Sequence, residues 1–216
     1  MRQGTIESVN REKIIVIVRG VEREKLILLA EAMYEGGIRL LEITFDASGK
    51  TSDEETASRI AMLKEHFGER MHIGAGTVLN TKQVELVAKA GGEFIISPNV
   101  KREVIEKTRE LSLVSMPGAL TPTEIADAYD FGADFVKLFP ITSMGVGYVK
   151  AVRAPLSHIP MLAVGGVDLD NIKDYLATGV CGFGMGSNII DKKMLEKGDF
   201  DGITRLAAEY VKAVRG

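Results

Sequence analysis

Short apolar runs alternate along the chain with segments of mixed polarity, and this alternation is the clearest pattern in the sequence. Each run has the length and the aliphatic or aromatic content of a strand that is buried on both faces. Eight runs occur at fairly even spacing: Ile14–Val18, Leu40–Thr44, His72–Ala75, Phe94–Ser97, Leu113–Met116, Phe135–Leu138, Met161–Val164 and Gly182–Met185. Strands that alternate with helices favour a parallel sheet covered by helices.

The segments between the runs carry helix signals. Thr81 is expected to cap a helix over Lys82–Ala90, and Thr121 is expected to cap another before Pro122. The glycines expected to end helices are Gly91, Gly132 and Gly179. The last helix shows one apolar face, with steps of three and four residues, made of Phe200, Ile203, Ala207, Tyr210 and Val214.

Eight such strand–helix units in 216 residues predict an α/β protein, a (β/α)8 TIM barrel. Because no proline-rich linker, charge block or low-complexity run divides the chain, we expect one domain over residues 1–216. An open, doubly wound sheet is the alternative. In a barrel, the functional groups are expected where the carboxyl ends of the strands meet.

The amino-acid composition and the net charge bear on which kinds of molecule the protein is expected to bind. The chain is 45% hydrophobic and 26% charged, with a formal charge of −3, so we expect no strong attraction to nucleic acid or to a membrane surface. The polar N-terminus and the lack of a long apolar stretch predict a cytoplasmic protein with neither a signal peptide nor a membrane span. The single cysteine, Cys181, excludes an intrachain disulfide and is expected to be a buried structural thiol.

Lys137 carries the strongest chemical signal. It lies inside the apolar run Phe135–Leu138. Because side chains alternate across a strand, Val136 and Leu138 suit the helix-facing side and Lys137 is expected to point into the barrel. Desolvation there favours the neutral, nucleophilic amine. The alternative is a structural lysine whose ammonium group reaches solvent or an ion pair.

Glu42 has the same kind of position in the run Leu40–Thr44. Leu41 and Ile43 suit the helix-facing side, which directs Glu42 inward. A buried carboxylate is costly without a partner, and Lys137, water or a substrate hydroxyl could serve. The two residues form either a structural ion pair or a general acid/base beside a nucleophilic amine.

Glycine-rich segments follow the last two runs. Gly165 and Gly166 follow the seventh run. Gly186 and Ser187 follow the eighth, where Ser187 is expected to cap a short helix that reaches Ile190. Barrels commonly bind phosphate at these positions through backbone N–H groups and a helix N-terminus. Glycine also serves plain turns, so the phosphate interpretation depends on the two segments occurring together.

Other polar residues follow the predicted strands. Thr77 follows the third, Pro98 the fourth and Arg19 the first, where its guanidinium can hold a carboxylate or phosphate. A plain turn or a solvated arginine is the alternative. No metal-ligand spacing links the three histidines, so the sequence predicts a site with neither a metal nor a cofactor.

Several motifs recur in order along nearly the whole chain: Leu41-Glu42-Ile43-Thr44, Gly74-Ala75-Gly76-Thr77-Val78, Ile96-Ser97-Pro98, Met116-Pro117-Gly118, Val136-Lys137-Leu138-Phe139-Pro140 and Gly165-Gly166-Val167. Together they resemble the bacterial 2-keto-3-deoxy-6-phosphogluconate (KDPG) / 4-hydroxy-2-oxoglutarate (KHG) aldolase family. The resemblance implies a class I aldolase of carbohydrate metabolism, in the Entner-Doudoroff type of pathway. It would cleave KDPG or a close 2-oxo-4-hydroxy acid to pyruvate and glyceraldehyde 3-phosphate or glyoxylate, as a homotrimer.

The resemblance also implies residue roles. Lys137 matches the Schiff-base lysine of the family, and Glu42 matches its catalytic acid/base. The substrate-binding residues it implies are Thr77 for pyruvate, Pro98 and Phe139 as pocket walls, and Gly165, Gly166 and Ser187 for phosphate.

The chain departs from the family pattern at two positions. Asp46 stands at or near an arginine that binds the substrate anion in many members, and Arg19 or Lys50 is expected to replace it. Val164 stands where many members have a threonine, which leaves the configuration at C4 open between the gluconate (KDPG) and galactonate (KDPGal) series.

Two other functions fit the same residues. A phosphosugar epimerase or isomerase would use Glu42 as its base and would form no imine. A non-catalytic barrel would bind a phosphorylated ligand and keep Glu42 and Lys137 as a buried pair.

Overall fold

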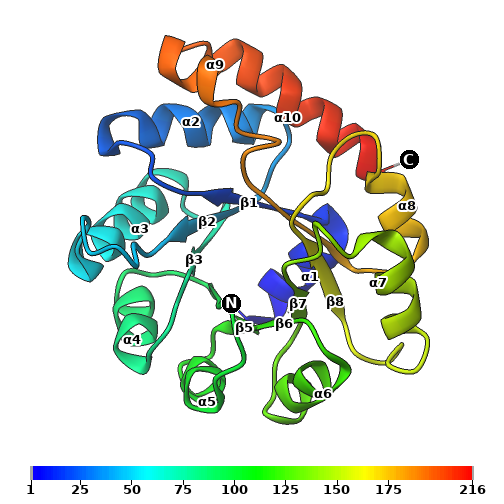
Figure 1. Cartoon of the computed structure of the whole chain (residues 1–216). Helices are drawn as coiled ribbons and strands as arrows, with labels where there is room; N and C mark the ends of the chain where they lie inside the picture. Colours follow the sequence, from blue (N-terminus) through cyan, green and yellow to red (C-terminus); the bar gives the residue numbers. More distant parts are fainter. Residues whose placement is uncertain (1, 216) are drawn as a thin grey trace.

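The computed structural model describes residues 2–215, in which a ring of parallel strands is surrounded by helices (Figure 1). The strands are β1 (Ile14–Val18), β2 (Leu40–Thr44), β3 (His72–Gly76), β4 (Phe94–Ile96), β5 (Val114–Met116), β6 (Gly118–Ala119), β7 (Val136–Leu138), β8 (Met161–Val164) and β9 (Gly182–Met185). The helices are α1 (Arg2–Glu12), α2 (Arg23–Glu35), α3 (Asp53–Phe67), α4 (Thr81–Lys89), α5 (Arg102–Glu110), α6 (Pro122–Asp130), α7 (Gly145–Arg153), α8 (Ile172–Ala177), α9 (Lys192–Lys197) and α10 (Phe200–Arg215). The predicted barrel is confirmed.

The fifth predicted strand is longer than the sequence indicated, and it is interrupted. Strand β5 pairs with β4, and β6 pairs with β7, with Pro117 between the two segments. Proline has no N–H group and breaks the ladder at that point. The N–H groups of Phe135 and Lys137 donate to the carbonyl oxygens of Ser115 and Pro117, so β5 and β6 close the ring as one strand path.

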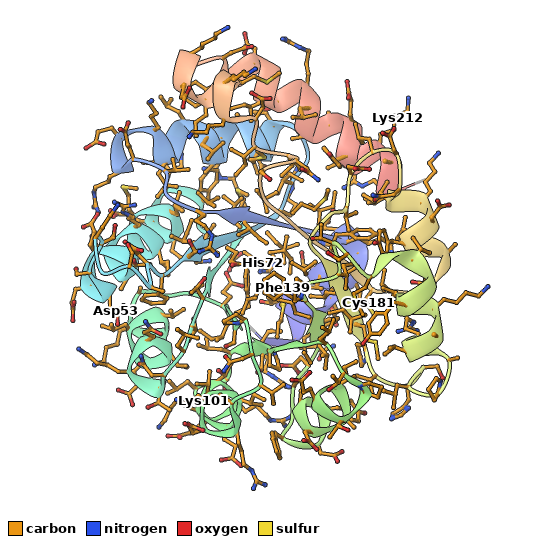
Figure 2. All side chains as sticks on the ribbon, in the orientation of Figure 1. Asp53, His72, Lys101, Phe139, Cys181 and Lys212 are labelled. Carbon is orange, nitrogen blue, oxygen red and sulfur yellow. The ribbon has the colours of Figure 1, made fainter. Side chains whose placement is uncertain are left out.

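Side chains alternate between two cores, as a barrel requires. Val136 and Leu138 lie in the outer core between strands and helices, and so do Leu41 and Ile43. An inner core fills the barrel; it contains Ile15, Leu40, Phe94, Ile96, Val114, Met116, Phe135, Leu162 and Val164. Side chains occupy the whole interior of the ring in Figure 2. The predicted inward and outward faces of β2 and β7 are confirmed.

Helix α1 lies at the amino-terminal end of the barrel, behind the strands in Figure 1, and no sequence signal predicted it. Val9 packs into the inner core from this end. Thr5 and Ser8 are also buried, and Arg2 forms an ion pair with Asp134. Because two of its three buried residues are polar, α1 shows little hydrophobic periodicity.

Three local predictions need correction. Asn80, not Thr81, caps α4, because its side chain accepts a hydrogen bond from the N–H of Gln83. The segment from Ser187 to Ile190 is a turn rather than a helix. Cys181 is half-buried rather than fully buried. Thr121 does cap α6, in a reciprocal capping box with Glu124 that holds both orphan N–H groups.

Within residues 2–215, none of the helices combines the length and the apolar character needed to cross a lipid bilayer.

Candidate active site

A cavity of about 480 Å³ opens at the carboxyl ends of the strands. All the site residues predicted from the sequence line it: Arg19, Glu42, Thr77, Pro98, Lys137, Phe139, Gly165, Gly166 and Ser187. They come from seven strands and the loops that follow them, so the barrel brings together groups that are distant in the sequence. The figures place this region inside the ring of helices, with Phe139 near its centre in Figure 2.

Lys137 projects from β7 into the cavity and is 7% exposed. Its Nζ lies 4.5 Å from the centroid of the Phe139 ring. Burial lowers the pKa of the Lys137 amine below its ordinary value, and the positive charge of Arg19 lowers it further against the opposing effect of Glu42. The neutral amine, which is the nucleophilic form, is therefore favoured.

Glu42 projects from β2 into the same cavity and is 1% exposed. Its Oε2 atom is buried and has no hydrogen-bond partner among the described residues. Burial raises the pKa of the Glu42 carboxyl, while the positive charges of Lys137 and Arg19 oppose that rise. A buried carboxyl oxygen without a partner is costly, so this atom is available to a proton or hydroxyl of a bound molecule.

Gly76 explains how the carboxyl group fits at this position. It ends β3 beside β2, and a Cβ atom at this residue would overlap the Glu42 carboxylate. Only a residue without a side chain leaves this space for the Glu42 carboxyl group.

Thr77 follows directly and has a φ angle of 56°. This backbone conformation is unfavourable for a β-branched residue and costs on the order of 1–3 kcal/mol. The Arg19 guanidinium donates a hydrogen bond of 3.1 Å to the Thr77 hydroxyl. Backbone strain of this kind persists where the surrounding structure holds the residue firmly in place, which is common in binding sites.

The two glycine segments lie side by side because β8 and β9 are neighbours. Gly165 and Gly166 have φ angles of 101° and 72°, which suit glycine. Asn188 donates a hydrogen bond of 2.7 Å to the carbonyl oxygen of Val167 and so ties the segment after β9 to the segment after β8. Gly165, Gly166 and Ser187 thereby line the same cavity, where the sequence analysis expected the phosphate.

Of the two residues expected to replace the family's arginine, Arg19 lines the cavity and Lys50 does not. Asp46 instead organises its own loop. Its carboxylate accepts hydrogen bonds from Ser48 and Thr51, which hold the pKa of Asp46 at about 2. Val164 also lines the cavity.

The cavity also has lining residues outside the predicted set, among them Ile17 and Thr142. Ile17 faces inward from β1 and could have been found from the alternation of that strand. Thr142 follows the cis Phe139-Pro140 peptide and packs against Gly165 and Gly166, so that a Cβ atom on either glycine would lie 3.0 Å from Thr142. No periodic signal marks such a loop residue.

The histidines lie apart from this site. His66 is on α3 and contacts Glu31, and the rings of His158 and Tyr129 meet edge to face. His72 starts β3 at the opposite end of the barrel and contacts Glu93. Across residues 2–215, no three His, Cys, Asp or Glu side chains gather in a geometry that could hold a metal ion.

Fold and cavity together define a β/α-barrel protein with a buried amine and a buried carboxyl group facing one pocket. Comparison with known proteins shows which family the chain belongs to. The sequence model of the KDPG and KHG aldolases matches residues 6–206, and the chain belongs to this family.

Similar proteins are named as aldolases of this family. A probable 2-dehydro-3-deoxy-6-phosphogalactonate aldolase of Rhizobium meliloti is 38% identical over 177 residues, which is 82% of this chain and 81% of that protein. A 2-dehydro-3-deoxy-phosphogluconate aldolase of Haemophilus influenzae is 30% identical and covers 99% of this chain and 98% of its own length.

Solved structures agree with this assignment. A structure described as native KDPGal superposes with a TM-score of 0.83 at 32% identity, over 94% of each chain. The KDPG aldolase of Legionella pneumophila, solved with pyruvate captured as a covalent carbinolamine, gives a TM-score of 0.83 at 27% identity, over 95% of this chain and 96% of the other. The chain is thus an aldolase of the KDPG and KHG family.

Proposed function

We propose that the protein is a class I aldolase that cleaves a 6-phosphorylated 2-oxo-3-deoxy sugar acid, KDPG or its galactonate epimer, to pyruvate and glyceraldehyde 3-phosphate. The observation that supports this most directly is the placement of the Lys137 amine and the Glu42 carboxyl group in one cavity, both shielded from water. The pyruvate trapped covalently in the Legionella pneumophila relative is consistent with amine chemistry in this family.

In the proposed mechanism, the Lys137 amine attacks the C2 carbonyl carbon, and loss of water leaves a protonated imine. Glu42, directly or through a water molecule, removes the proton of the C4 hydroxyl. The C3–C4 bond then breaks, its electron pair moves into the imine to form an enamine, and the aldehyde leaves. Protonation of the enamine at C3 and hydrolysis of the imine release pyruvate. The cationic imine stabilises the developing carbanion.

The remaining residues bind the substrate in this proposal. Thr77 holds the pyruvate carboxylate, with its hydroxyl positioned by Arg19. Pro98 and Phe139 form the walls beside the imine. The phosphate would bind at Gly165, Gly166 and Ser187, where backbone N–H groups supply the donors.

Imine formation is tested by treating the protein with sodium borohydride in the presence of pyruvate. We expect irreversible inactivation and, by peptide mass spectrometry, a reduced adduct on Lys137. Lys137→Met should give no adduct and lose at least three orders of magnitude in cleavage rate, because no other step replaces the imine. A Lys137→Met variant that kept most of its rate would exclude this mechanism, and turnover without any trapping would favour an isomerase that needs no imine.

The role of Glu42 is tested separately. Glu42→Gln keeps the shape of the side chain but cannot accept the hydroxyl proton, so we expect cleavage to slow by about two to four orders of magnitude. Borohydride trapping of pyruvate on Lys137 should persist in this variant, because the amine remains. Near-normal turnover by Glu42→Gln would reduce Glu42 to a structural role.

The substrate proposal is tested by comparing kcat/KM for KDPG, KDPGal and KHG. Because KHG carries no phosphate, we expect both phosphorylated acids to be cleaved with the higher kcat/KM. The Rhizobium meliloti relative is named for the galactonate series, and the apolar Val164 faces the cavity, so both epimers belong in the comparison. A clear preference for KHG would contradict the phosphate site.

We also propose that the protein is a cytoplasmic homotrimer, as the family resemblance implies. Sedimentation equilibrium of the purified protein would measure the mass of the assembly directly, and a monomer at micromolar concentration would contradict this proposal.

A further inference from the structure

Thr142 lines the candidate active site with a polar side chain that has no role in the mechanism described above. The side chain is exposed, so a molecule in the cavity can reach it. Within residues 2–215, its hydroxyl group has no hydrogen-bond partner. A hydroxyl group can donate one hydrogen bond, and this donor is therefore free for a ligand.

The loop that carries Thr142 follows β7 and is anchored by the neighbouring residue, Ile141. Ile141 is fully buried, and its N–H group donates a hydrogen bond of 3.3 Å to the carbonyl oxygen of Val164. The N–H group of Met144 donates a hydrogen bond of 2.9 Å back to the carbonyl oxygen of Ile141 and closes a turn. The backbone at Thr142 is thus held beside the segment that follows β8.

The two glycines of that segment allow Thr142 to approach closely. A Cβ atom on Gly165 would lie 3.0 Å from Oγ1 of Thr142, and one on Gly166 would lie 3.0 Å from its Cα atom. The Thr142 hydroxyl group therefore lies next to the backbone where the phosphate is proposed to bind. Val164, which precedes the glycines, has no hydroxyl group to offer there.

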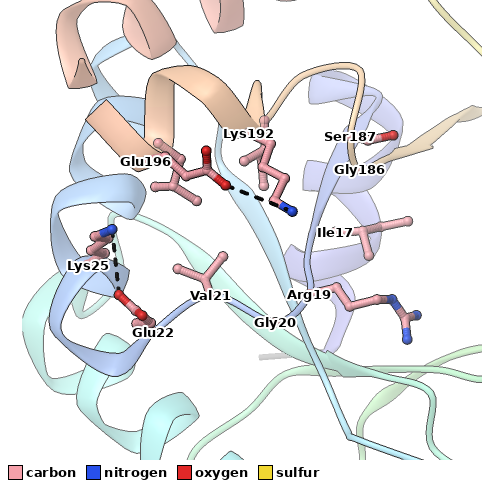
Figure 3. Close-up of a pocket in the computed structure, with 12 residues that line it drawn as sticks. Ile17, Arg19, Gly20, Val21, Glu22, Lys25, Gly186, Ser187, Lys192 and Glu196 are labelled. Atoms are coloured by element: carbon pink, nitrogen blue, oxygen red, sulfur yellow. Dashed lines mark ion pairs between the residues drawn. The ribbon is translucent and has the colours of Figure 1, made fainter. Parts of the chain in front are cut away.

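The order of the strands places the glycines between two hydroxyl groups. Strand β8 pairs with β7 on one side and with β9 on the other. The segments after these strands carry Thr142 on the β7 side and Ser187 on the β9 side. Figure 3 shows Ser187 from an adjoining cavity of about 510 Å³, and its hydroxyl group points away from Lys192 on the far wall of that cavity.

We propose that Thr142 determines the specificity for a phosphorylated substrate, because its hydroxyl group donates a hydrogen bond to a phosphate oxygen. This inference rests on the proposed function. With C2 bonded to Lys137 and the carboxylate at Thr77, which follows β3 across the ring from β8, the phosphate end of the substrate lies beside Thr142. A hydrogen bond to a charged phosphate oxygen is stronger than one to a neutral oxygen.

The test compares Thr142→Val with Thr142→Ser. Valine keeps the branched shape and removes the hydroxyl group, whereas serine keeps the hydroxyl group. We expect Thr142→Val to raise KM for the phosphorylated acids KDPG and KDPGal about tenfold and to leave kcat within about twofold, because a hydrogen bond made to substrate and transition state alike is lost. KM for KHG, which has no phosphate, should change by less than about twofold, and Thr142→Ser should behave as the wild type.

The matched control is Ser143→Ala, because Ser143 is the next residue of the same turn and is also exposed but lines neither cavity. An unchanged KM for the phosphorylated acids in Thr142→Val would overturn the inference, and so would an equal rise for KHG. The same rise in Thr142→Ser or in Ser143→Ala would show that the hydroxyl group of Thr142 is not the cause.

Titration calorimetry with glycerol 3-phosphate separates this inference from the proposed function. This compound carries a phosphate but no carbonyl group, so it binds without forming an imine. Its Kd should be about tenfold higher for Thr142→Val than for the wild type. Equal affinity, or no binding by the wild type, would refute the role of Thr142 even where borohydride traps pyruvate on Lys137. The expected difference in a protein that traps no pyruvate would instead refute the proposed function alone.

Discussion

Gly76 shows how a single residue without a side chain can support the chemistry of its neighbour. Its backbone runs so close to Glu42 that any Cβ atom would displace the carboxyl group. The carboxyl group is the buried end of a flexible side chain, so a Cβ atom at residue 76 would shift it from its present place in the cavity. Gly76 thus leaves the carboxyl group the place that the proposed reaction requires.

We therefore expect Gly76→Ala to lower kcat by about two orders of magnitude, because Glu42 no longer reaches the substrate hydroxyl. The overpacking should also reduce the free energy of unfolding by about 1–3 kcal/mol, measured by urea denaturation. Gly147→Ala is the control, because a Cβ atom on this α7 glycine meets nothing within 4 Å. An active, fully stable Gly76→Ala protein would contradict the close packing described above.

At the level of elements, the amino-terminal end of the barrel is held together by Glu93, which follows α4 and is buried. Its carboxylate accepts hydrogen bonds from Thr5 on α1 and Lys64 on α3. His72 at the start of β3 is its third partner. Burial alone would raise the pKa of Glu93, but these partners outweigh it and hold the pKa at about 2. One carboxylate thus connects α1 and α3 to β3.

This network predicts how stability depends on pH. Because the pKa of Glu93 falls from 4.5 to about 2 on folding, its contribution is complete above pH 4.5 and is lost as the pH falls toward 2. We expect the free energy of unfolding of the wild type to fall by roughly 1–3 kcal/mol more than that of Glu93→Gln across this range.

Urea denaturation at a series of pH values measures this difference. Glu65→Gln is the control, because Glu65 is exposed on α3 and should leave the pH dependence unchanged. Parallel curves for the wild type and Glu93→Gln would show that Glu93 is not the group responsible.

On the scale of the whole molecule, the two ends of the barrel have different roles. Helix α1 and the Glu93 network close the amino-terminal end, whereas the candidate active site opens at the carboxyl end. Enclosure by the barrel also supplies the desolvation that lowers the pKa of Lys137 and raises that of Glu42. The description of residues 1–216 as a single domain stays a prediction.

Local patterns in the sequence predicted much of this arrangement. The bounds of β1, β2, β8 and β9 match the apolar runs, because fully buried strands are continuous in hydrophobicity and end abruptly. The inward direction of Glu42 and Lys137 followed from the period of two along a strand. Local patterns predicted neither helix α1 nor the break at Pro117. Helix α1 has little hydrophobic periodicity, and the break depends on which strands pair.

By itself, the sequence determined the eight repeated units and the inward direction of Glu42 and Lys137, and it indicated the residues proposed for the pyruvate site. These are properties of short segments, so the pattern of residues within each segment is enough to predict them. Only the tertiary structure decided that Arg19 rather than Lys50 lines the site and that Gly76 makes room for Glu42. Each of these depends on distances between loops and strands that are far apart in the chain, which no local pattern records.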